Sequence, residues 1–374
     1  MVRPPESSTT MLAAVVEKFG EPYRMRRVSR PSSPQGQDIL LKVLAASYCH
    51  TDAVFASGGL SQTLPRIGCH EFAGQVLEVG PNVPKTRGIF AGLHVGVPGR
   101  AYHPCGTCYE CQNTGPDEIS YSPYCPRAGN LGLTQDGGFQ EFCLVDSRQV
   151  APLPEGLSPL QAAPLMCAGL TIWSALRHDA VQRASTVGIL GAGGGLEHSG
   201  VQFAARLGKR VLAIDANDAA LAHLKQVKHG LGSAGTSVHV ADARTVNVHE
   251  TKGIWEESST KLPTEIGLDT IILLPESQKA FDLGMQLLRN HGTMIVLSFP
   301  KEKLSVSAHD LVFRDIRLVG SLVGRNAQRR EMLEFFVKSG VKASVKAYPF
   351  EQLNELVRDS EQGVSGKLVI DMTL

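Results

Sequence analysis

Runs of apolar and β-branched residues near the N-terminus predict strands. Residues 11–16 and 39–45 form two such runs, and Pro31, Pro34 and Gly36 between them predict a loop. The second run ends just before a cysteine, Cys49, which is therefore expected on a loop or short helix leaving that strand.

Later in the chain, strand-like and helix-like patterns alternate. A buried-type strand is expected at 186–190, followed by a glycine-rich turn, a helix from 201 and a second strand at 210–214. Further elements are expected as strands at 237–240, 268–274, 293–298 and 316–323, a helix at 276–288, a polar exposed loop at 253–264, a helix at 329–339 and a closing strand at 367–372. This alternation predicts a parallel, doubly wound sheet, with the last helix and strand returning to the first domain.

An apolar stretch at 160–176 predicts one helix that carries Cys167 and Thr171. These two residues are four positions apart, so they are expected on the same face of that helix. Taken alone, a threonine in an apolar helix is more often a core residue than a functional one.

Size and composition point to an ordinary globular protein. The 374 residues suggest about two domains at roughly 150 residues each. The net charge of +1 gives no electrostatic case for nucleic acid or an anionic membrane as a partner. No apolar run reaches the roughly 18 residues that a membrane span needs, and the first ten residues do not resemble a signal peptide. A cytoplasmic protein is expected, and its eight cysteines are therefore expected to bind metal ions rather than to form disulfides.

Three short segments offer ligands for a transition metal. Cys49 heads Cys-His-Thr-Asp, His70 lies in Cys-His-Glu, and Cys167 follows much later. Two thiolates and one imidazole suit a tetrahedral Zn²⁺ site whose fourth position is open to water or substrate. The thiolates would balance the 2+ charge, leaving a Lewis acid that can stabilise an alkoxide. The alternative for any lone cysteine is a buried core residue.

A second cysteine group has the spacing of a closed metal site. Cys105, Cys108, Cys111 and Cys125 can supply four thiolates to a structural zinc. A redox pair or a nucleic-acid-binding zinc module are the alternatives, but no basic stripe flanks the group.

The glycine-rich turn has the context of a dinucleotide-binding site. It lies between a strand and a helix, and a second strand ends in Asp215, 24 positions after Gly191. Its glycines would let backbone amides approach a pyrophosphate at the helix N-terminus. Asp215 would hold ribose hydroxyls and repel a 2′-phosphate, which favours NAD over NADP. The expected cofactor-binding residues here are Gly191, Gly193, Gly194, Gly195, Leu196 and Asp215.

In its motifs and their order the chain resembles the medium-chain, zinc-dependent alcohol dehydrogenase family, from about Met11 to the end. The resemblance implies an α/β protein with a GroES-like, mainly β catalytic domain, 1–172 with 323–374 returning to it, and a Rossmann NAD-binding domain, 173–322. It implies one catalytic and one structural zinc, NAD(H), a small alcohol or carbonyl substrate bound between the domains, and a homodimer or homotetramer associating near 293–323.

The resemblance also implies roles for individual residues. Cys49, His70 and Cys167 match the catalytic-zinc ligands, Glu71 a carboxylate that can approach the metal, and Asp52 a group bonded to the ligand imidazole. Thr51 matches the hydroxyl that takes the alcohol proton. His50 and Arg325 match residues near the cofactor phosphates, and Thr171 one near the nicotinamide.

Several positions depart from the family pattern. Val54 stands where some members place a histidine that ends the proton relay, and the small residues of 56–60 replace bulky aromatics, which predicts a roomier pocket. Thirteen residues separate Cys111 from Cys125, where seven are usual. Glu197 stands where glycine is usual, and Arg325 lies one position early.

The leading prediction is an alcohol dehydrogenase or carbonyl reductase. A substrate bulkier than ethanol and a role in a specialised biosynthetic pathway are further expectations. The alternatives are a zinc-free quinone or enoyl reductase of the same superfamily and a degenerate NAD-binding protein without activity.

Overall fold

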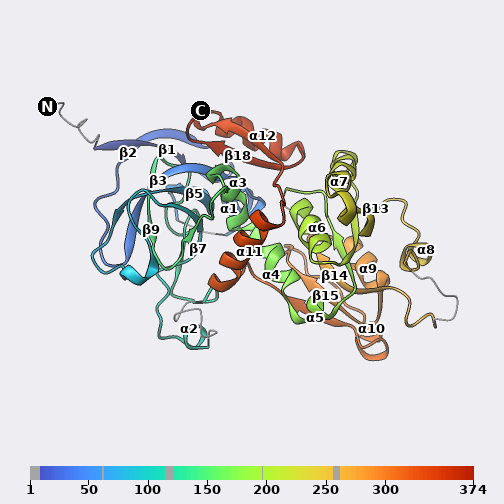
Figure 1. Ribbon diagram of the computed structural model, residues 1–374. Helices are drawn as coiled ribbons and strands as arrows, with labels where there is room; N and C mark the ends of the chain where they lie inside the picture. The colour runs from blue at the N-terminus through green and yellow to red at the C-terminus, as the bar shows by residue number, and fades with distance from the viewer. Residues whose placement is uncertain (1–8, 61–62, 114–121, 196, 256–261) are drawn as a thin grey trace. The chain divides into compact units, whose positions relative to one another are not determined.

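The computed structural model describes residues 9–60, 63–113, 122–195, 197–255 and 262–374 (Figure 1). The chain divides into two compact units. Unit 1 comprises Met1–Ala168, Arg325–Val337 and Ser344–Leu374, and unit 2 comprises Gly169–Gly324 and Lys338–Ala343.

Unit 1 is mainly β-structure. Its strands are β1 (Thr10–Val16), β2 (Arg24–Ser29), β3 (Asp38–Ser47), β4 (Arg66–Ile67), β5 (Glu71–Val79), β6 (His94–Pro98), β7 (Arg100–Tyr102), β8 (Gly129–Asn130), β9 (Phe142–Asp146), β10 (Ala151–Pro152), β17 (Val345–Pro349) and β18 (Lys367–Asp371). The largest sheet has the order β10-β6-β5-β3-β18-β17, with β9 also paired to β3. The other sheets are β2-β1-β4 and β7-β8.

The helices of unit 1 are short apart from two near the C-terminus. They are α1 (His50–Ala56), α2 (Tyr109–Gln112), α3 (Pro159–Ala162), α11 (Asn326–Lys338) and α12 (Leu353–Glu361), with 3₁₀ turns η1 (Lys85–Arg87), η2 (Ala163–Met166) and η4 (Phe350–Gln352). Runs of buried residues on β1, β3 and β5 form much of the core, where Leu41, Phe72 and Phe139 are completely buried. The mainly β first domain is therefore as expected.

Unit 2 is a six-stranded parallel sheet with helices. The strands are β11 (Thr186–Leu190), β12 (Arg210–Asp215), β13 (Val238–Asp242), β14 (Leu268–Leu273), β15 (Leu288–Val296) and β16 (Arg317–Gly320). The helices are α4 (Ala168–Leu176), α5 (Asp179–Arg183), α6 (Glu197–Arg206), α7 (Asp218–Gly230), α8 (Val248–Lys252), α9 (Gln278–Leu287) and α10 (Ala308–Phe313), with the 3₁₀ turn η3 (Gly232–Ser237). The order β13-β12-β11-β14-β15-β16 reverses direction at β11, as in a Rossmann fold, so the predicted doubly wound sheet is confirmed.

The stretch predicted as one helix over 160–176 is broken, and that prediction is wrong. It forms α3, then η2, and only after Cys167 does α4 begin. Pro164 has no N–H to continue the helical hydrogen bonds, and Cys167 has φ −121° and ψ −73°, outside helical geometry. Cys167 therefore lies at the junction rather than on a helix with Thr171.

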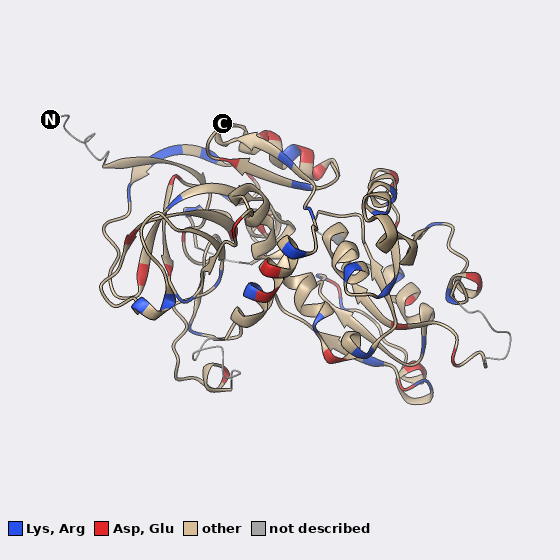
Figure 2. Cartoon of the chain, viewed as in Figure 1, with Lys and Arg blue, Asp and Glu red and all other residues tan. Residues whose placement is uncertain are grey.

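Two surface properties complete the description. Positive and negative side chains are interspersed along the elements of each unit (Figure 2), in keeping with the net charge of +1. Within the described ranges no single helix is long and apolar enough to cross a membrane, although the bent pair Pro159–Met166 and Ala168–Leu176 meets the length and composition criteria together.

Candidate metal centres and nucleotide site

Three ligand side chains from distant segments converge in unit 1. Cys49 follows β3 and precedes α1, His70 immediately precedes β5, and Cys167 lies between η2 and α4. Their ligand atoms all lie within 4.8 Å of one another, and His70 Nε2 is 3.2 Å from Cys167 Sγ. One ion can therefore contact all three.

Asp52 connects two of these ligands. Its Oδ1 accepts a hydrogen bond from His70 Nδ1 at 2.9 Å, and its Oδ2 accepts one from the backbone N–H of Cys49 at 3.0 Å. Asp52 is completely buried in the first turn of α1, so its carboxylate holds the ring in place with Nε2 directed towards Cys167 Sγ.

The electrostatics of the group suit a cation. A hydrogen bond with Cys167 lowers the pKa of the Cys49 thiol well below its usual range, and the same contact raises the pKa of Cys167. One thiolate is therefore favoured already, and a divalent cation would let both sulfurs ionise. Two thiolates and a neutral imidazole fit the ligand preference of Zn²⁺.

Glu71 lies beside this group but is engaged elsewhere. Its Oε1 accepts a hydrogen bond from Ser47 Oγ at 2.7 Å and forms an ion pair with Lys367, while its Oε2 accepts one from the backbone N–H of Ala168 at 3.3 Å. Burial raises the pKa of Glu71 to about 7, and the Lys367 ammonium opposes that rise. Glu71 is not part of the three-residue ligand group.

Lys367 was missed by sequence reasoning. It is only 4% exposed on β18, and its Nζ also donates to the carbonyl of Tyr48 at 2.9 Å. Glu71 raises the pKa of Lys367 against the opposing effect of burial, so the ammonium stays charged. A lysine followed by a strand pattern carries no local signal, because its partner is 296 positions earlier in the chain.

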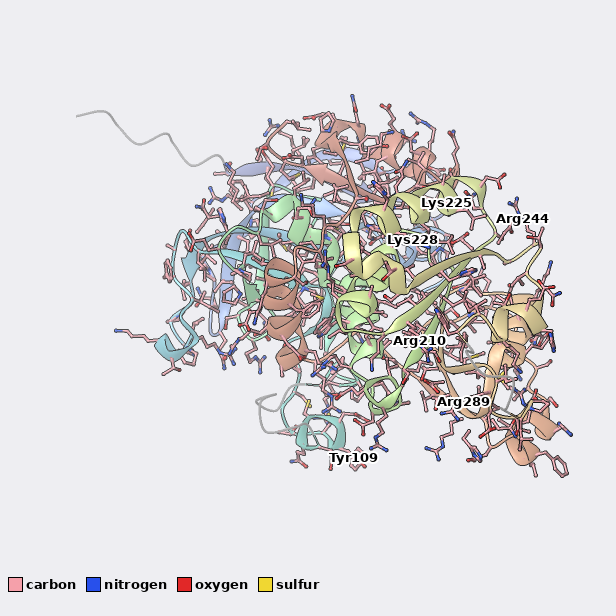
Figure 3. The ribbon with its side chains drawn as sticks, turned by 45° about the vertical axis from the view of Figure 1, so that its right-hand side comes forward. Tyr109, Arg210, Lys225, Lys228, Arg244 and Arg289 are labelled. Carbon is pink, nitrogen blue, oxygen red and sulfur yellow. The ribbon has the colours of Figure 1, made fainter. Side chains whose placement is uncertain are left out.

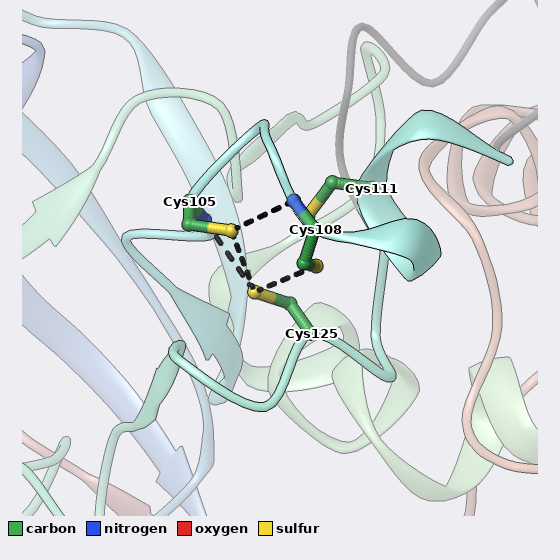
Figure 4. Close-up of side chains that lie close together, drawn as sticks. All are labelled: Cys105, Cys108, Cys111 and Cys125. Atoms are coloured by element: carbon green, nitrogen blue, oxygen red, sulfur yellow. Dashed lines mark hydrogen bonds between the residues drawn. The ribbon is translucent and has the colours of Figure 1, made fainter.

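The structure also brings the second cysteine group together (Figure 4). The sulfurs of Cys105, Cys108, Cys111 and Cys125 all lie within 4.8 Å of one another. Backbone and side-chain hydrogen bonds from Thr107 lower the pKa of Cys105 to about 5. Four thiols in one cluster, none in a disulfide, fit a closed thiolate zinc site. Most of the long segment between Cys111 and Cys125 lies outside the described residues, but the four sulfurs still meet.

The first turns of α1 carry the residues expected to move a proton. His50 is exposed at the start of α1, Thr51 is half-buried after it, and Val54 follows one turn later. Both His50 and Thr51 are thus held within two positions of Cys49.

The glycine turn of unit 2 packs tightly against neighbouring elements. Gly191 has φ +76°, which favours glycine, and a Cβ on Gly193 would lie 2.5 Å from the Cβ of Ala220 on α7. Asp215, at the end of β12, accepts hydrogen bonds from Gly193 N at 2.9 Å through Oδ2 and from Ala216 N at 2.8 Å through Oδ1. A hydrogen bond therefore joins the glycine turn directly to the Asp215 carboxylate.

A cavity of about 700 Å³ opens beside this turn, a size suited to an adenosine-sized ligand. Gly191 and Asp215 line it. Gly194 and Gly195 continue the turn, whereas Leu196 and the side chain of Glu197 lie outside the described residues. Thr171 lies within α4 of unit 2, and Arg325 is exposed just before α11 of unit 1.

Comparisons with known proteins agree with this architecture. Residues 35–155 match the model of the alcohol dehydrogenase GroES-like domain, and residues 195–338 match that of the zinc-binding dehydrogenase family. An alcohol dehydrogenase of Geobacillus stearothermophilus is 30% identical over 365 residues, 97% of this chain and 99% of the relative. Alcohol dehydrogenase 1 of Emericella nidulans is 31% identical over 369 residues, 97% of this chain and 98% of the relative.

Solved structures give the same result. The alcohol dehydrogenase of Aeropyrum pernix superposes with a TM-score of 0.80 at 25% identity, covering 96% of this chain and 99% of that one. The acetophenone reductase of Geotrichum candidum, solved with NAD, superposes with a TM-score of 0.79 at 24% identity, covering 98% of each chain, and shows the same fold. The chain belongs to the zinc-dependent medium-chain alcohol dehydrogenase family.

Proposed function

We propose that this chain is a zinc- and NAD(H)-dependent enzyme that interconverts alcohols with aldehydes or ketones. The observation that carries the proposal is the convergence of Cys49, His70 and Cys167, with Asp52 bonded to the far side of the imidazole. When bound, zinc supplies a Lewis acid for the substrate oxygen and the nucleotide supplies or accepts a hydride.

The remaining work falls to residues of this chain. Asp52 orients the His70 ring through the Nδ1–H hydrogen bond. Thr51 takes the hydroxyl proton of the alcohol, and His50, exposed beside it, passes that proton towards solvent in place of a later histidine. Thr171 and Arg325 are proposed to contact the cofactor.

A second zinc is proposed in the four-cysteine cluster, where it closes the lobe around α2. Cys105, Cys108, Cys111 and Cys125 would complete a tetrahedral site with no vacant position. Its role is structural, because all four coordination positions are taken by cysteines and none is left for a substrate.

The cofactor is proposed to be NAD(H) in preference to NADP(H). Asp215 sits in the cavity at the end of β12, where its carboxylate can accept hydrogen bonds from ribose hydroxyls and would repel a 2′-phosphate.

The substrate is proposed to be bulkier than ethanol. The segment 56–60 after α1 consists of small residues and one leucine, and Val54 precedes it. A specialised biosynthetic role on a larger aldehyde or hydroxymethyl compound follows from the same argument. Turnover confined to two- and three-carbon alcohols in a substrate series would contradict both.

Association into a homodimer or homotetramer is proposed through the β16 edge of the unit 2 sheet. Among the described strands β16 pairs with β15 alone, which leaves its other edge open. The adjacent helix α10 exposes Leu311, Val312 and Phe313, the last two to more than 70%. A second copy of this chain would cover both.

A zinc-free quinone or enoyl reductase is the nearest alternative within the superfamily. Such an enzyme has no use for the Cys49, His70 and Cys167 group or for a buried carboxylate on the imidazole. A degenerate, inactive nucleotide-binding protein is the alternative from another class, and metal content separates it from the proposal. The free state of all eight cysteines supports the proposed cytoplasmic location.

Metal analysis combined with activity tests the proposal. The purified chain should hold two zincs, and Cys49→Ser should hold one and lose about a hundredfold or more in alcohol oxidation. Cys143→Ala is the control, because Cys143 is another free cysteine of unit 1 that belongs to neither metal group. Full turnover after exhaustive chelation would refute the metal-dependent function.

A further inference from the structure

The candidate adenosine cavity contains an arginine whose presence conflicts with an NAD preference. Arg244 lines the cavity together with Asp215 and Lys279. In dinucleotide-binding domains an arginine near the end of the second strand commonly accepts the 2′-phosphate of NADP, whereas an acidic residue holds the 2′-hydroxyl of NAD. Asp215 therefore favours NAD, whereas Arg244 favours NADP. The hydrogen bonds of Arg244 show whether its guanidinium is available to a phosphate.

Arg244 is already committed to two carboxylates. Its Nε is 2.9 Å from Asp242 Oδ1, and its Nη2 is 2.7 Å from Asp242 Oδ2 and 2.5 Å from Asp218 Oδ1. Asp242 also accepts a hydrogen bond from the backbone N–H of Arg244 at 2.8 Å, which closes a tight turn after β13. Two of the three guanidinium nitrogens are thus engaged by acids of the chain itself.

The acids come from neighbouring strand ends. Asp215 and Asp242 are register partners on the parallel pair β12 and β13, and Asp218 opens α7 three positions after Asp215. Figure 3 labels Arg244 on this part of unit 2, with Lys225 and Lys228 on the neighbouring helix α7. Arg244 hydrogen bonds lower the pKa of Asp218 and of Asp242, so both carboxylates stay ionised at neutral pH.

This arrangement leaves neither a free guanidinium donor pair nor a net positive charge for a phosphate. Guanidinium recognises phosphate through two parallel N–H donors, a geometry that Asp242 has taken. Two carboxylates also outweigh the single positive charge of Arg244, and Asp215 adds a third. A 2′-phosphate entering here would meet net negative charge and no available guanidinium fork.

We propose that Asp218 and Asp242 are specificity-determining residues, which favour NAD(H) over NADP(H) by withholding Arg244 from a 2′-phosphate. The inference rests on the proposed nucleotide site and extends its selectivity beyond Asp215. Lys279 is the other positively charged residue that lines the cavity, and it is exposed at the start of α9. An ion pair between Lys279 and the 2′-phosphate would be a competing source of affinity for NADP(H).

Titration of the zinc-loaded full-length protein with NADH and with NADPH, followed by nucleotide fluorescence, tests the proposal. Wild type should bind NADH more tightly. Asp218→Asn with Asp242→Asn should tighten NADPH binding about tenfold and change NADH binding less than about threefold. Adding Arg244→Gln should abolish that gain. The single variant Asp218→Asn, at a side chain 84% exposed, should give part of the gain if the double variant folds poorly.

A charge-matched control separates local from general effects. Asp179→Asn with Asp315→Asn removes two carboxylates of unit 2 that do not line the cavity, and it should leave both affinities unchanged. An equal gain in this control, no gain in the test variants, or a gain that survives Arg244→Gln would overturn the proposal. Binding of neither nucleotide by wild type would instead overturn the proposed function.

Discussion

At the scale of residues, the candidate zinc site depends on one carboxylate that reaches two ligands. Asp52 bonds both the His70 ring and the backbone of Cys49. Its role was predicted from family resemblance, and the observed contacts give that role a physical basis. Ligand-supporting carboxylates of this kind contribute about 10- to 100-fold to metal affinity.

We expect Asp52→Asn to weaken zinc binding by about 10- to 100-fold, because the neutral amide no longer stabilises the ring orientation electrostatically. Competition with a chromophoric chelator measures the affinity. Glu78→Gln, an exposed change on β5 outside the site, is the control. An affinity equal to that of wild type would show that Asp52 is dispensable.

Lys367 shows what residue patterns alone could not reveal. We expect Lys367→Met to lower the free energy of unfolding by about 3–5 kcal/mol, because it leaves the buried Glu71 carboxylate unpaired. Denaturant unfolding measures the loss. Adding Glu71→Gln should restore most of it, and a double variant no more stable than the single one would contradict this explanation.

A third residue-scale prediction concerns pH. His103 Nε2 is 2.6 Å from Asp38 Oδ1, and this hydrogen bond raises the pKa of His103 above its usual value. A raised pKa in the folded state means that the ion pair stabilises the fold fully below about pH 6.5 and is lost as pH rises through the raised value.

His103→Gln should therefore cost more stability at pH 5.5 than at pH 9. The difference should stay below about 1 kcal/mol, because the imidazole is half-exposed and screened. Unfolding of wild type and variant at both pH values measures it. A cost independent of pH would mean that the ion pair contributes nothing.

At the scale of elements, burial decides which strands sequence patterns could predict. The expected strand at 39–45 appears as β3 (Asp38–Ser47), because seven of its ten residues are buried and give a clear apolar run. β2 gave no such signal: its sequence is Arg-Met-Arg-Arg-Val-Ser and none of its residues is buried. The break at Cys167 was missed because an apolar pattern continues across Pro164.

The glycine turn provides an element-scale prediction. We expect Gly193→Ala to weaken NADH binding at least about tenfold, because its Cβ would collide with Ala220 and force the turn away from α7. Gly230→Ala is the matched control, since a Cβ there meets nothing within 4 Å at the end of the same helix. Equal NADH affinity of both variants in a fluorescence titration would contradict the packing argument.

At the scale of the whole molecule, alternating strands and helices were enough to predict the doubly wound sheet. The convergence of Cys49, His70 and Cys167 was anticipated from the resemblance and not from spacing, because loop geometry sets it. Contacts between residues far apart in the chain, such as Lys367 with Glu71 at 296 positions, leave no pattern in a single sequence.

The association of subunits is a property of the whole molecule. We expect wild type to have the mass of a dimer or tetramer in light scattering, and Phe313→Asp to shift it towards the monomer, because a charge on the exposed α10 surface opposes burial. Phe90→Asp, at a phenylalanine 59% exposed in unit 1, is the control. A monomeric wild type would refute the proposed interface.

The position of β18 has a consequence for biosynthesis. Unit 1 receives this strand between β17 and β3 from the final residues of the chain, after unit 2 has been traversed. The strands of unit 2 are therefore synthesised while the largest sheet of unit 1 still lacks the interior strand β18. Until then Glu71 also lacks Lys367, its ion-pair partner on that strand. Unit 1, although its synthesis begins first, can therefore complete its largest sheet only after every strand of unit 2 has been translated.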